Sequence, residues 1–338
     1  MVLVTGGTGL IGSHLLLELV KNGANVRAVY RNQDSIKKVE RIFAYYGVSP
    51  KKVYENIQWV KANIVDVPRL EKAMDGIELV YHCAALISFD PKDYKKLVKT
   101  NVEGTKNVVN VSCAKGIKKL CYVSSIAALG TALKGKVIDE QNEWSDKNAS
   151  VYATTKRNAE LEVWRGMQEG LDAVIVNPGV VLGPGFWKSG SGTFFYHAAK
   201  ERDKTVPGGT GFISVSDVIA VMMKLMAAEI TNERFVLVEE NTTFLDMMQR
   251  IAKNLGVKPP KKIYSFFQIE AFWRMDWARA HLFEKRRILS KNMAKSLYQM
   301  DSYSAKKVKD AIGVDFEGLE ETIRLSARLF REDYPQLF

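Results

Sequence analysis

The chain has 338 residues, of which 46% are hydrophobic, which is enough for one large α/β domain or for one domain with a smaller lobe. It carries 49 basic and 38 acidic residues, a net charge of +11, but no helix-turn-helix, zinc-finger or RNP-type pattern, so nucleic acid is not an expected partner. No uncharged apolar stretch reaches the roughly 20 residues that span a bilayer, and the first predicted strand begins at the N-terminus, so we expect a cytoplasmic protein without a signal peptide.

The first two thirds of the sequence alternate β-rich and helical segments, which is typical of a parallel sheet covered by helices on both faces. The predicted strands are residues 2–4, 25–30, 57–60, 79–81, 119–123, 173–176 and 235–238. The predicted helices between them include residues 11–22, 67–74, 94–115 and 151–170. We therefore predict a doubly wound parallel-sheet Rossmann domain of about seven strands.

The regular alternation ends after Pro178. Residues 179–211 are rich in Gly, Pro and aromatic residues and suggest loops over a cleft, whereas a further helix is predicted at 217–228 and mostly helical structure from 241 onward. We predict a nucleotide-binding domain of residues 1–179 and 213–239, a smaller, mostly helical substrate lobe of residues 180–212 and 240–315, and a C-terminal helix within residues 316–338.

Residues 2–12 are predicted to form a strand, a glycine turn and the start of a helix. Gly6 permits a tight turn, Gly9 lets the backbone approach a pyrophosphate, and Gly12 lets the helix pack close to the strand. Free N–H groups and the positive end of the helix dipole would face the phosphates. The strand before and the amphipathic helix after the turn favour a dinucleotide site over an ordinary glycine-rich turn. The predicted contacts are Gly6, Thr8, Gly9, Leu10, Ile11 and Gly12.

Arg31 directly follows the second predicted strand, where NAD-binding proteins usually carry an Asp or Glu for the ribose 2′-OH. An arginine there can form charge-assisted bidentate bonds with a 2′-phosphate, and Lys37 and Lys38 follow closely. Alternatively, Arg31 is an ordinary surface residue and Asp34 contacts the ribose of NAD(H). We prefer NADP(H), with NAD(H) as the alternative cofactor.

Tyr152 and Lys156 are spaced i and i+4, which places them on one face of a predicted helix. A nearby ammonium favours the phenolate and would lower the tyrosine pKa from about 10, so that Tyr152 could exchange a proton with a carbinol oxygen. Ser124 and Ser125 end the fifth predicted strand, at the sheet edge where ligands bind in such folds. One of these hydroxyls would orient the substrate oxygen, unless the pair only caps a turn.

These motifs resemble those of the extended short-chain dehydrogenase/reductases and, among them, the dihydroflavonol-4-reductase-like group. The resemblance covers nearly the whole chain and is more specific for the superfamily than for the group. The matching segments are residues 5–12, 82–85, 100–105, 123–125, 152–156, 177–185, 207–211 and 215–218.

The resemblance implies that Tyr152 is the general acid in reduction and that Lys156 bonds the nicotinamide ribose and lowers the Tyr152 pKa. It also implies that Ser125 bonds the substrate oxygen, that Asn101 supports a proton relay, and that His82 is a packing residue. The implied cofactor contacts nearer the nicotinamide are Ala84, Ala85, Pro178 and Val181. A homodimer formed through the helices at 94–115 and 151–170 is a further implication.

The chain departs from the family pattern at two places. Asn63 and Ile64, directly after the third predicted strand, are placed to border the adenine, but the family commonly has Gly-Asp-Leu where this chain has Ala62, Asn63 and Ile64. Ser216 stands where an arginine is frequent, which weakens any claim that the substrate is a nucleotide diphosphate.

The cysteine, histidine and acidic residues indicate neither a disulfide framework nor a metal site. Cys83, Cys113 and Cys121 lack metal-ligand spacing and are too few for a disulfide framework, so we expect buried side chains in a reducing compartment. No cluster of His, Cys or carboxylate residues in the sequence suggests a metal site.

Aromatic residues gather in the segments 186–196 and 266–277. Positions 266, 269, 273, 277 and 280 form one helical stripe, which we expect to face the core of the lobe. Alternatives are a lid over an aromatic, lipidic or steroid-like carbonyl compound and, least favoured, a membrane-surface helix beside Lys285, Arg286 and Arg287. Residues 258–310 contain 13 basic and 5 acidic residues, a difference of +8, which we interpret as a solvated face rather than an attraction for an anionic substrate or a membrane.

Three functions are compatible with these patterns. We prefer an NADP(H)-dependent oxidoreductase that reduces a ketone or aldehyde, or oxidises the alcohol, on a small apolar or aromatic substrate. The alternative is an NAD-dependent sugar-nucleotide epimerase or dehydratase, which uses the same Tyr/Lys pair, although Arg31 and the lack of a Phe-Asn pair before the Gly-Pro motif count against it. A non-catalytic protein on the same fold is disfavoured by the intact set of Ser125, Tyr152 and Lys156.

Overall fold

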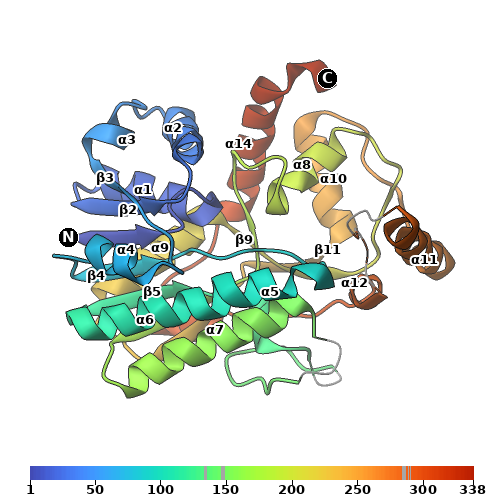
Figure 1. The fold of residues 1–338 in the computed structure, drawn as a ribbon. Coiled ribbons are helices and arrows are strands. Elements are labelled where there is room, and N and C mark those ends of the chain that lie inside the picture. The colour runs from blue at the N-terminus through green and yellow to red at the C-terminus, as the bar shows by residue number, and fades with distance from the viewer. Residues whose placement is uncertain (133–134, 146–148, 284–286, 288, 290) are drawn as a thin grey trace.

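A seven-stranded parallel sheet with helices on both faces forms the centre of the molecule (Figure 1). It is seen in a computed structural model that describes residues 1–132, 135–145, 149–283, 287, 289 and 291–338. In spatial order the strands are β10 (Glu233–Leu237), β6 (Ala173–Pro178), β5 (Lys119–Val123), β4 (Leu79–His82), β1 (Val2–Thr5), β2 (Val26–Tyr30) and β3 (Ile57–Lys61). The predicted doubly wound sheet is confirmed, and every predicted strand lies within two residues of its expected bounds.

The strand order reverses beside β1, which pairs with β2 on one side and with β4 on the other. In register, Thr5 lies opposite His82, so the carboxyl ends of β1 and β4 lie next to each other. A crevice outside the carboxyl ends of the strands at such a reversal is the usual ligand site of an open α/β sheet. The fold therefore places the glycine turn after β1 at this position.

Two apolar layers bury the sheet, one on each face. One layer is built on α1 (Leu10–Lys21), α2 (Ile36–Tyr45), α3 (Lys52–Glu55) and α9 (Val215–Ala227). The other is built on α4 (Val67–Ala73), α6 (Gly104–Lys115) and α7 (Val151–Gln168). Strands covered on both sides must be apolar on both sides of the pleat, which explains why β5 and β6 are buried along their whole length.

The segment predicted as one helix at 94–115 is divided by a π-helical stretch. α5 (Tyr94–Leu97) leads into the π-helical residues Val98–Glu103, and α6 follows directly. Such wide turns occur mostly at functional sites, and this one contains the buried Asn101.

Short strands occupy segments that the sequence analysis assigned to loops or to helical structure. β7 (Val180–Leu182), β9 (Gly209–Ser214) and β11 (Glu240–Thr243) form a three-stranded sheet, and β8 (Lys204–Thr205) pairs with β12 (Lys262–Ile263). The glycines that suggested loops allow a close approach of two chain segments, because a Cβ on Gly179 would lie 2.4 Å from the carbonyl oxygen of Gly211.

The lobe beside the sheet has an aromatic core. Its helices are α8 (Thr193–Ala198), α10 (Phe244–Leu255) and α14 (Gly318–Asp333). Trp187 and Phe195 are buried there against Phe330 of α14, at ring-centroid distances of 5.3 and 6.4 Å. The predicted domain boundaries stay a prediction, and Val308 of α13 (Lys306–Ile312) packs with the core of the sheet.

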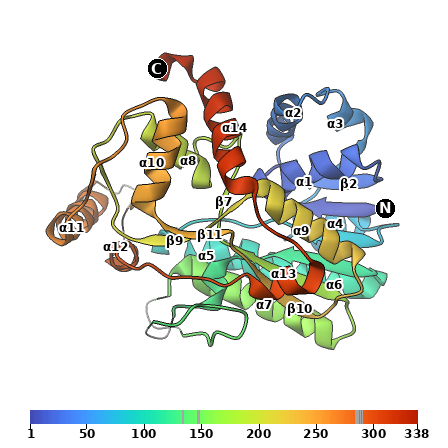
Figure 2. The ribbon, with the colours of Figure 1, turned by 180° about the vertical axis from the view of Figure 1, so that it is seen from behind.

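Within the lobe, the C-terminal helix α14 stands nearest the N-terminal helices, between them and α8 and α10 (Figure 2). At its end, Asp333 accepts hydrogen bonds from Arg41 of α2 at 2.6 Å, from Trp187 at 2.6 Å and from Tyr45. At its start, the backbone N–H of Gly318 donates to Asp217 at 3.0 Å. The helix is thus attached to the body of the protein at both ends.

Glu239 takes part in the attachment at the start of α14 and has an unusual pKa. Its Oε1 accepts the Leu319 N–H at 3.1 Å, and burial, reinforced by the negative charge of Asp217, raises the Glu239 pKa from 4.5 to about 7. Because the folded state binds this proton more tightly than the unfolded chain, the resulting stabilisation is full below about pH 4.5 and is lost as the pH rises through about 7.

Glu239→Gln is neutral at every pH, so we expect it to raise the Tm above pH 7 by about 2–4 °C and to leave it unchanged near pH 5. Thermal unfolding followed by circular dichroism across this pH range checks the expectation. The exposed Glu229→Gln is the matched control. Parallel pH profiles of Tm for Glu239→Gln and the wild type would contradict it.

Two helices, α11 (Phe266–Leu282) and α12 (Lys291–Ser296), complete the fold. Ile269 and Ala280 of the predicted stripe on α11 are buried, but the prediction that the stripe faces the lobe core is wrong for Phe266 and Trp277, which are more than half exposed. Lys285 and Arg286 lie outside the described residues. Within the described ranges, no helix is both long and apolar enough to cross a lipid bilayer.

Candidate active site

The glycine turn after β1 brings the backbone unusually close to two neighbours. Gly6 has a φ of +69°, and a Cβ there would lie 2.6 Å from the backbone nitrogen of Ala84. A Cβ on Gly12 would lie 2.2 Å from the carbonyl oxygen of Gly6, so neither position tolerates a side chain. Gly9 is the N-cap of α1, and no side chain caps this helix. The first N–H groups of α1 are therefore directed toward the crevice and can bind an anion.

The remaining predicted residues of the turn also lie at this edge. Thr8, Leu10 and Ile11 are half-buried. Leu10 belongs to the first turn of α1, and its Cδ1 would lie 3.2 Å from a Cβ on Gly183, just beyond β7. The structure thus brings the segment after β7 next to the glycine turn.

The residues predicted for the adenosine end follow β2 and β3 at the same edge of the sheet. Arg31 is exposed immediately after β2, and Asp34 forms an exposed ion pair with Lys37 at 3.1 Å. Asn63 is half-buried in the turn after β3, where its carbonyl accepts the Asp66 N–H at 2.8 Å. The side chain of Ile64 points into the core, so the structure separates it from Asn63.

Four further predicted residues extend from β4 to β7. The Ala84 N–H donates to Thr5 Oγ1 at 3.3 Å, which holds the segment after β4 against the glycine turn, and Ala85 is exposed. Pro178 is buried at the end of β6, and Val181 is half-buried in β7. These residues lie along the carboxyl edge of the sheet on the side away from Arg31.

Ser125 lies within hydrogen-bonding reach of the Tyr152 hydroxyl. Tyr152 lies in the first turn of α7 and is buried, and its ring contacts Phe89 with centroids 5.6 Å apart. Ser125 directly follows Ser124 at the end of β5. Burial raises the Tyr152 pKa to about 12, although the hydrogen bond with Ser125 acts in the opposite direction.

Lys156 is fully buried one turn after Tyr152, but its ammonium is bound to β5. Its Nζ donates to the Tyr122 hydroxyl at 2.9 Å and to the Val123 carbonyl at 2.8 Å. Burial lowers the Lys156 pKa to about 7, while the negative charge of Glu160 acts to raise it. The expectation that Lys156 lowers the Tyr152 pKa is wrong for this structure, because the loss of hydration on burial dominates at both groups.

Asn101 connects the π-helical stretch to α7. Its Nδ2 donates to the Leu86 carbonyl at 3.0 Å and to Thr155 Oγ1 at 3.2 Å, and its Oδ1 accepts the Leu86 N–H at 2.7 Å. Thr155 lies between Tyr152 and Lys156, so Asn101 positions the helix that carries both residues.

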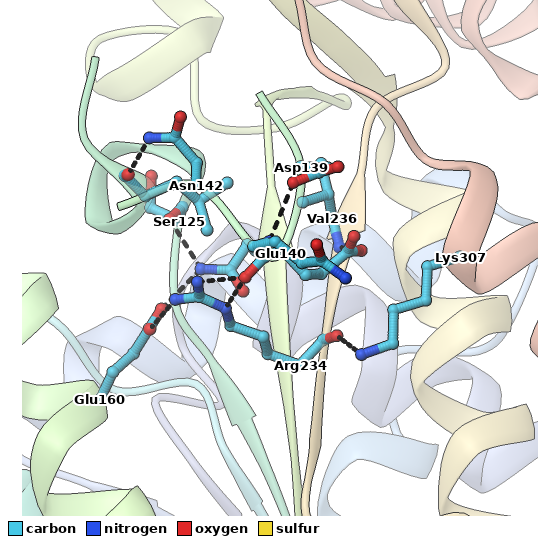
Figure 3. Close-up of polar contacts among 11 residues, drawn as sticks. Ser125, Asp139, Glu140, Asn142, Glu160, Arg234, Val236 and Lys307 are labelled. Atoms are coloured by element: carbon cyan, nitrogen blue, oxygen red, sulfur yellow. Dashed lines mark hydrogen bonds and ion pairs between the residues drawn. The ribbon is translucent and has the colours of Figure 1, made fainter. Parts of the chain in front are cut away.

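A buried polar network that the sequence analysis missed surrounds Glu160, one helix turn after Lys156 on α7 (Figure 3). Glu160 is fully buried and forms an ion pair with Arg234 of β10 at 3.5 Å. Asn177 of β6 donates from Nδ2 both to Glu160 Oε1 at 2.5 Å and to the Ser125 carbonyl at 3.0 Å. The network therefore links the backbone of Ser125 to the helix turn that follows Lys156.

Part of this network had a signal in the sequence. Glu160 follows Lys156 by four residues and so lies on the same face of α7, which predicts a shared environment. Arg234 comes 74 residues later in the chain, and only the pairing of β10 with β6 brings it near Glu160. No local pattern indicates that contact.

His82 and the cysteines have no place among the reactive groups. His82 is fully buried, and its two ring nitrogens bond the hydroxyls of Thr5 at 2.7 Å and of Thr105 at 2.9 Å, which fits the expected packing role. Cys83, Cys113 and Cys121 are all free. Only Cys121 is fully buried, so the expectation of three buried thiols is wrong for Cys83 and Cys113, which are half-buried.

Comparison with known proteins gives one matching family model. The model described as "NAD dependent epimerase/dehydratase family" matches residues 2–237. Among curated proteins, sterol demethylase protein B of Methylococcus capsulatus is 28% identical over 77% of this chain and 76% of its own length. The putative dihydroflavonol 4-reductase of Synechocystis is 29% identical over 76% of this chain and 73% of its own length.

A solved structure shows the same fold over the whole chain. The UDP-glucose 4-epimerase of Thermotoga maritima, crystallised with UDP-glucose, has a TM-score of 0.76 at 20% identity and covers 98% of this chain and 99% of its own. At this level of identity the likeness concerns the fold.

Proposed function

Because the chain belongs to the NAD dependent epimerase/dehydratase family, the extended short-chain dehydrogenase/reductases, we propose that it is an NADP(H)-dependent oxidoreductase that reduces the carbonyl group of a small apolar compound or oxidises the corresponding alcohol. The observation that carries the proposal is the placement of Tyr152 beside Ser125 at the carboxyl edge of the sheet, one helix turn from the buried Lys156. The relative named as a putative dihydroflavonol 4-reductase supports a reductase.

The residues of the crevice fit a dinucleotide. The glycine turn leaves no room for side chains and directs the uncapped N-terminus of α1 outward, which suits a pyrophosphate. Arg31 would bind the 2′-phosphate of NADP(H), Lys156 the nicotinamide ribose, and Pro178 and Val181 would flank the nicotinamide. When bound, the cofactor supplies or accepts the hydride.

Tyr152 is suited to donate a proton. With its pKa raised to about 12, the phenol stays protonated at neutral pH, so it can donate a hydrogen bond to a carbonyl oxygen and pass its proton to the oxygen as negative charge develops there. The hydroxyl of Ser125 would bond the same oxygen and orient it. Lys156 would supply the opposite charge for the phenolate that remains.

An apolar substrate is favoured by the side chains that border Tyr152. Phe89 contacts the Tyr152 ring and is exposed on its other side, and Ile87 on the same segment is also exposed. Ser216 bonds Ser214 at 2.8 Å and offers no cation for a nucleotide diphosphate. The relative named sterol demethylase protein B supports an apolar compound as well.

We also propose a cytoplasmic homodimer. The three free thiols are typical of a reducing compartment. The dimer would form through α6 and α7, where Leu161 is an exposed apolar residue.

A screen of aromatic and alicyclic ketones and aldehydes for NADPH oxidation tests the proposed reaction. We expect turnover of at least one compound and none when the protein is left out. Purified protein that retains NAD and interconverts UDP-sugars without net consumption of cofactor would instead establish the epimerase chemistry.

Arg31→Ser is expected to weaken NADPH binding about tenfold, or by about 1.4 kcal/mol, while the Kd for NADH changes by less than about twofold. The reason is that only NADPH carries the 2′-phosphate. Fluorescence titration measures both constants, with the exposed Arg69→Ser on α4 as the control. Equal affinities of the wild-type protein for NADPH and NADH would contradict the proposed role of Arg31.

A further inference from the structure

Helix α11 lies at the outer edge of the molecule, at the end remote from α1, α2 and α3 (Figures 1 and 2). Its inner side is buried at Ile269 and Ala280 and is fixed by Asp276, which accepts the Leu289 N–H at 3.0 Å. A surface helix normally turns a polar face to solvent, and the outer side of α11 is different.

The outer side carries a continuous apolar stripe, which is not the one predicted from the sequence and consists of residues 267, 271, 275, 278 and 282. Phe267 is 82% exposed and Leu282 is 73% exposed. Between them, the exposed Met275 and Ala271 and the half-buried Ala278 follow at spacings of three or four residues, which places all five on one side of the helix. The stripe runs for about 22 Å along the axis at 1.5 Å per residue. A strip of this length is more than the scattered apolar residues normal for a protein surface.

Basic residues border this stripe. At the N-terminal end of α11, an open depression of about 650 Å³ is lined by Lys204, Lys261 and Lys262 together with Ile263 and Ser265. Of these three lysines, only Lys262 has an acidic ion-pair partner within the described ranges, Asp203 at 3.8 Å.

More positive charge comes from the neighbouring helix α12. Lys291 and Lys295 are exposed there, and Lys291 lies over the Trp273 ring of α11 at 5.9 Å. Trp273 follows Ile269 by four residues and so lies on the buried side of α11, which places Lys291 away from the apolar stripe. The cations that border the stripe are those of the depression at its start.

The charges decide which surface can cover the stripe. A second copy of the chain, related by a two-fold axis across the stripe, would place Lys204, Lys261 and Lys262 against the end of the partner's α11. Residues 277–283 there include Arg279 and no carboxylate, so this contact would offer the lysines no negative charge. A bilayer that contains anionic lipid offers an apolar boundary for the stripe and negative headgroups for the lysines. Aromatic side chains such as Trp277, which is exposed on the flank of the stripe, are favoured at such boundaries.

We propose that α11 docks the protein reversibly on the surface of an anionic bilayer. In this arrangement Phe267, Met275 and Leu282 enter the boundary between headgroups and acyl chains, while the lysines of the depression contact the phosphates of the headgroups. The inference reverses the expectation that a membrane-surface role is the least favoured one, because the sequence did not show that this side of the helix is exposed. It does not depend on the proposed reaction.

The test is co-sedimentation of the full-length protein with two kinds of vesicle. One contains phosphatidylcholine alone, and the other contains phosphatidylcholine and phosphatidylglycerol in roughly a three-to-one ratio. We expect at least about tenfold stronger binding to the anionic vesicles, and weaker binding as salt is added.

Two sets of variants separate the contributions of the apolar side chains and of the lysines to vesicle binding. Phe267→Ser combined with Leu282→Ser is expected to lower binding about tenfold or more, and Lys261→Gln combined with Lys262→Gln to lower binding to the anionic vesicles alone. The matched control is Tyr54→Ser, which removes an exposed aromatic residue on α3. An unchanged Kd for NADPH in each variant shows that the fold is intact.

Three results would overturn the proposal. One is the absence of binding to either kind of vesicle. Another is equal binding by the wild type and by the protein with Phe267→Ser and Leu282→Ser. The third is a concentration-dependent dimer in analytical ultracentrifugation that these substitutions dissociate without any vesicle binding, which would identify a second copy as the partner of α11.

Discussion

Replacing Tyr152 by phenylalanine is expected to lower kcat for carbonyl reduction by about 10²–10⁴-fold and to change the Kd for NADPH by less than about twofold. The substitution removes the only atom through which this side chain can donate a proton, and it leaves the ring packed against Phe89. Single-turnover reduction under saturating NADPH measures the chemical step, and fluorescence titration measures cofactor binding.

A buried tyrosine elsewhere in the sheet provides the control. Tyr81 of β4 is buried in the apolar layer on the α1 face, so Tyr81→Phe removes a hydroxyl of the same kind without touching Ser125. We expect little change in kcat for this variant. If Tyr152→Phe retains the wild-type rate with the same substrate, the proton must come from another group.

Glu160→Gln is expected to have the second largest effect, acting on both stability and cofactor binding. Glu160 is fully buried beside Arg234, and removing one partner of a buried ion pair costs about 3–5 kcal/mol. The negative charge of Glu160 raises the Lys156 pKa, which burial already lowers to about 7, so the substitution moves this pKa further down. Lys156 would then be mostly uncharged at neutral pH.

The consequence for cofactor binding depends on pH. If Lys156 binds the nicotinamide ribose as an ammonium, Glu160→Gln should bind NADPH with a higher Kd than the wild type at pH 7.5. The Kd should fall back toward the wild-type value as the pH is lowered by about one unit or more. Urea unfolding and NADPH titration from pH 6 to 8 measure the two effects. Glu162→Gln on the same helix, which breaks a surface pair with Arg165, should cost less than about 1 kcal/mol. An unchanged pH profile for Glu160→Gln would show that Glu160 does not control the charge of Lys156.

The sheet could be predicted because its signals are local. β5 and β6 are continuous apolar runs, since buried parallel strands have no solvent face. The glycine turn could be recognised for a similar reason, because Gly6 and Gly12 are required by backbone contacts within the segment itself and with the strand next to it.

The short strands of the second sheet could not be predicted in this way. Gly209 and Gly211 of β9 gave the segment the composition of a loop. A Cβ on Gly209 would meet the backbone of Thr242 and one on Gly211 the side chain of Val238, and both neighbours come from a later part of the chain. The π-helical stretch around Asn101 likewise follows from contacts with Leu86 and Thr155, which a helical periodicity does not show.

The positions of the candidate site residues in the fold could be predicted more readily than their electrostatics. The spacing of Tyr152 and Lys156 correctly places both on one side of α7. The pKa of each group depends on how deeply it is buried, and burial is a property of the whole fold. In the same way, periodicity showed that α11 is apolar but not which of its sides the protein covers.

The carboxylate of Asp333 connects the helix after the proposed cofactor contact Arg31 with the lobe that we propose binds the substrate. It accepts hydrogen bonds from Arg41 and Tyr45 on α2, the helix that follows Arg31, and from Trp187 in the aromatic core of the lobe. A movement of α2 would therefore be passed to the lobe through this carboxylate, alongside the contact of Lys38 with the Phe186 ring. Any substitution in this segment that is aimed at cofactor preference has to preserve these hydrogen bonds, because their loss would loosen the contact between α2 and the lobe.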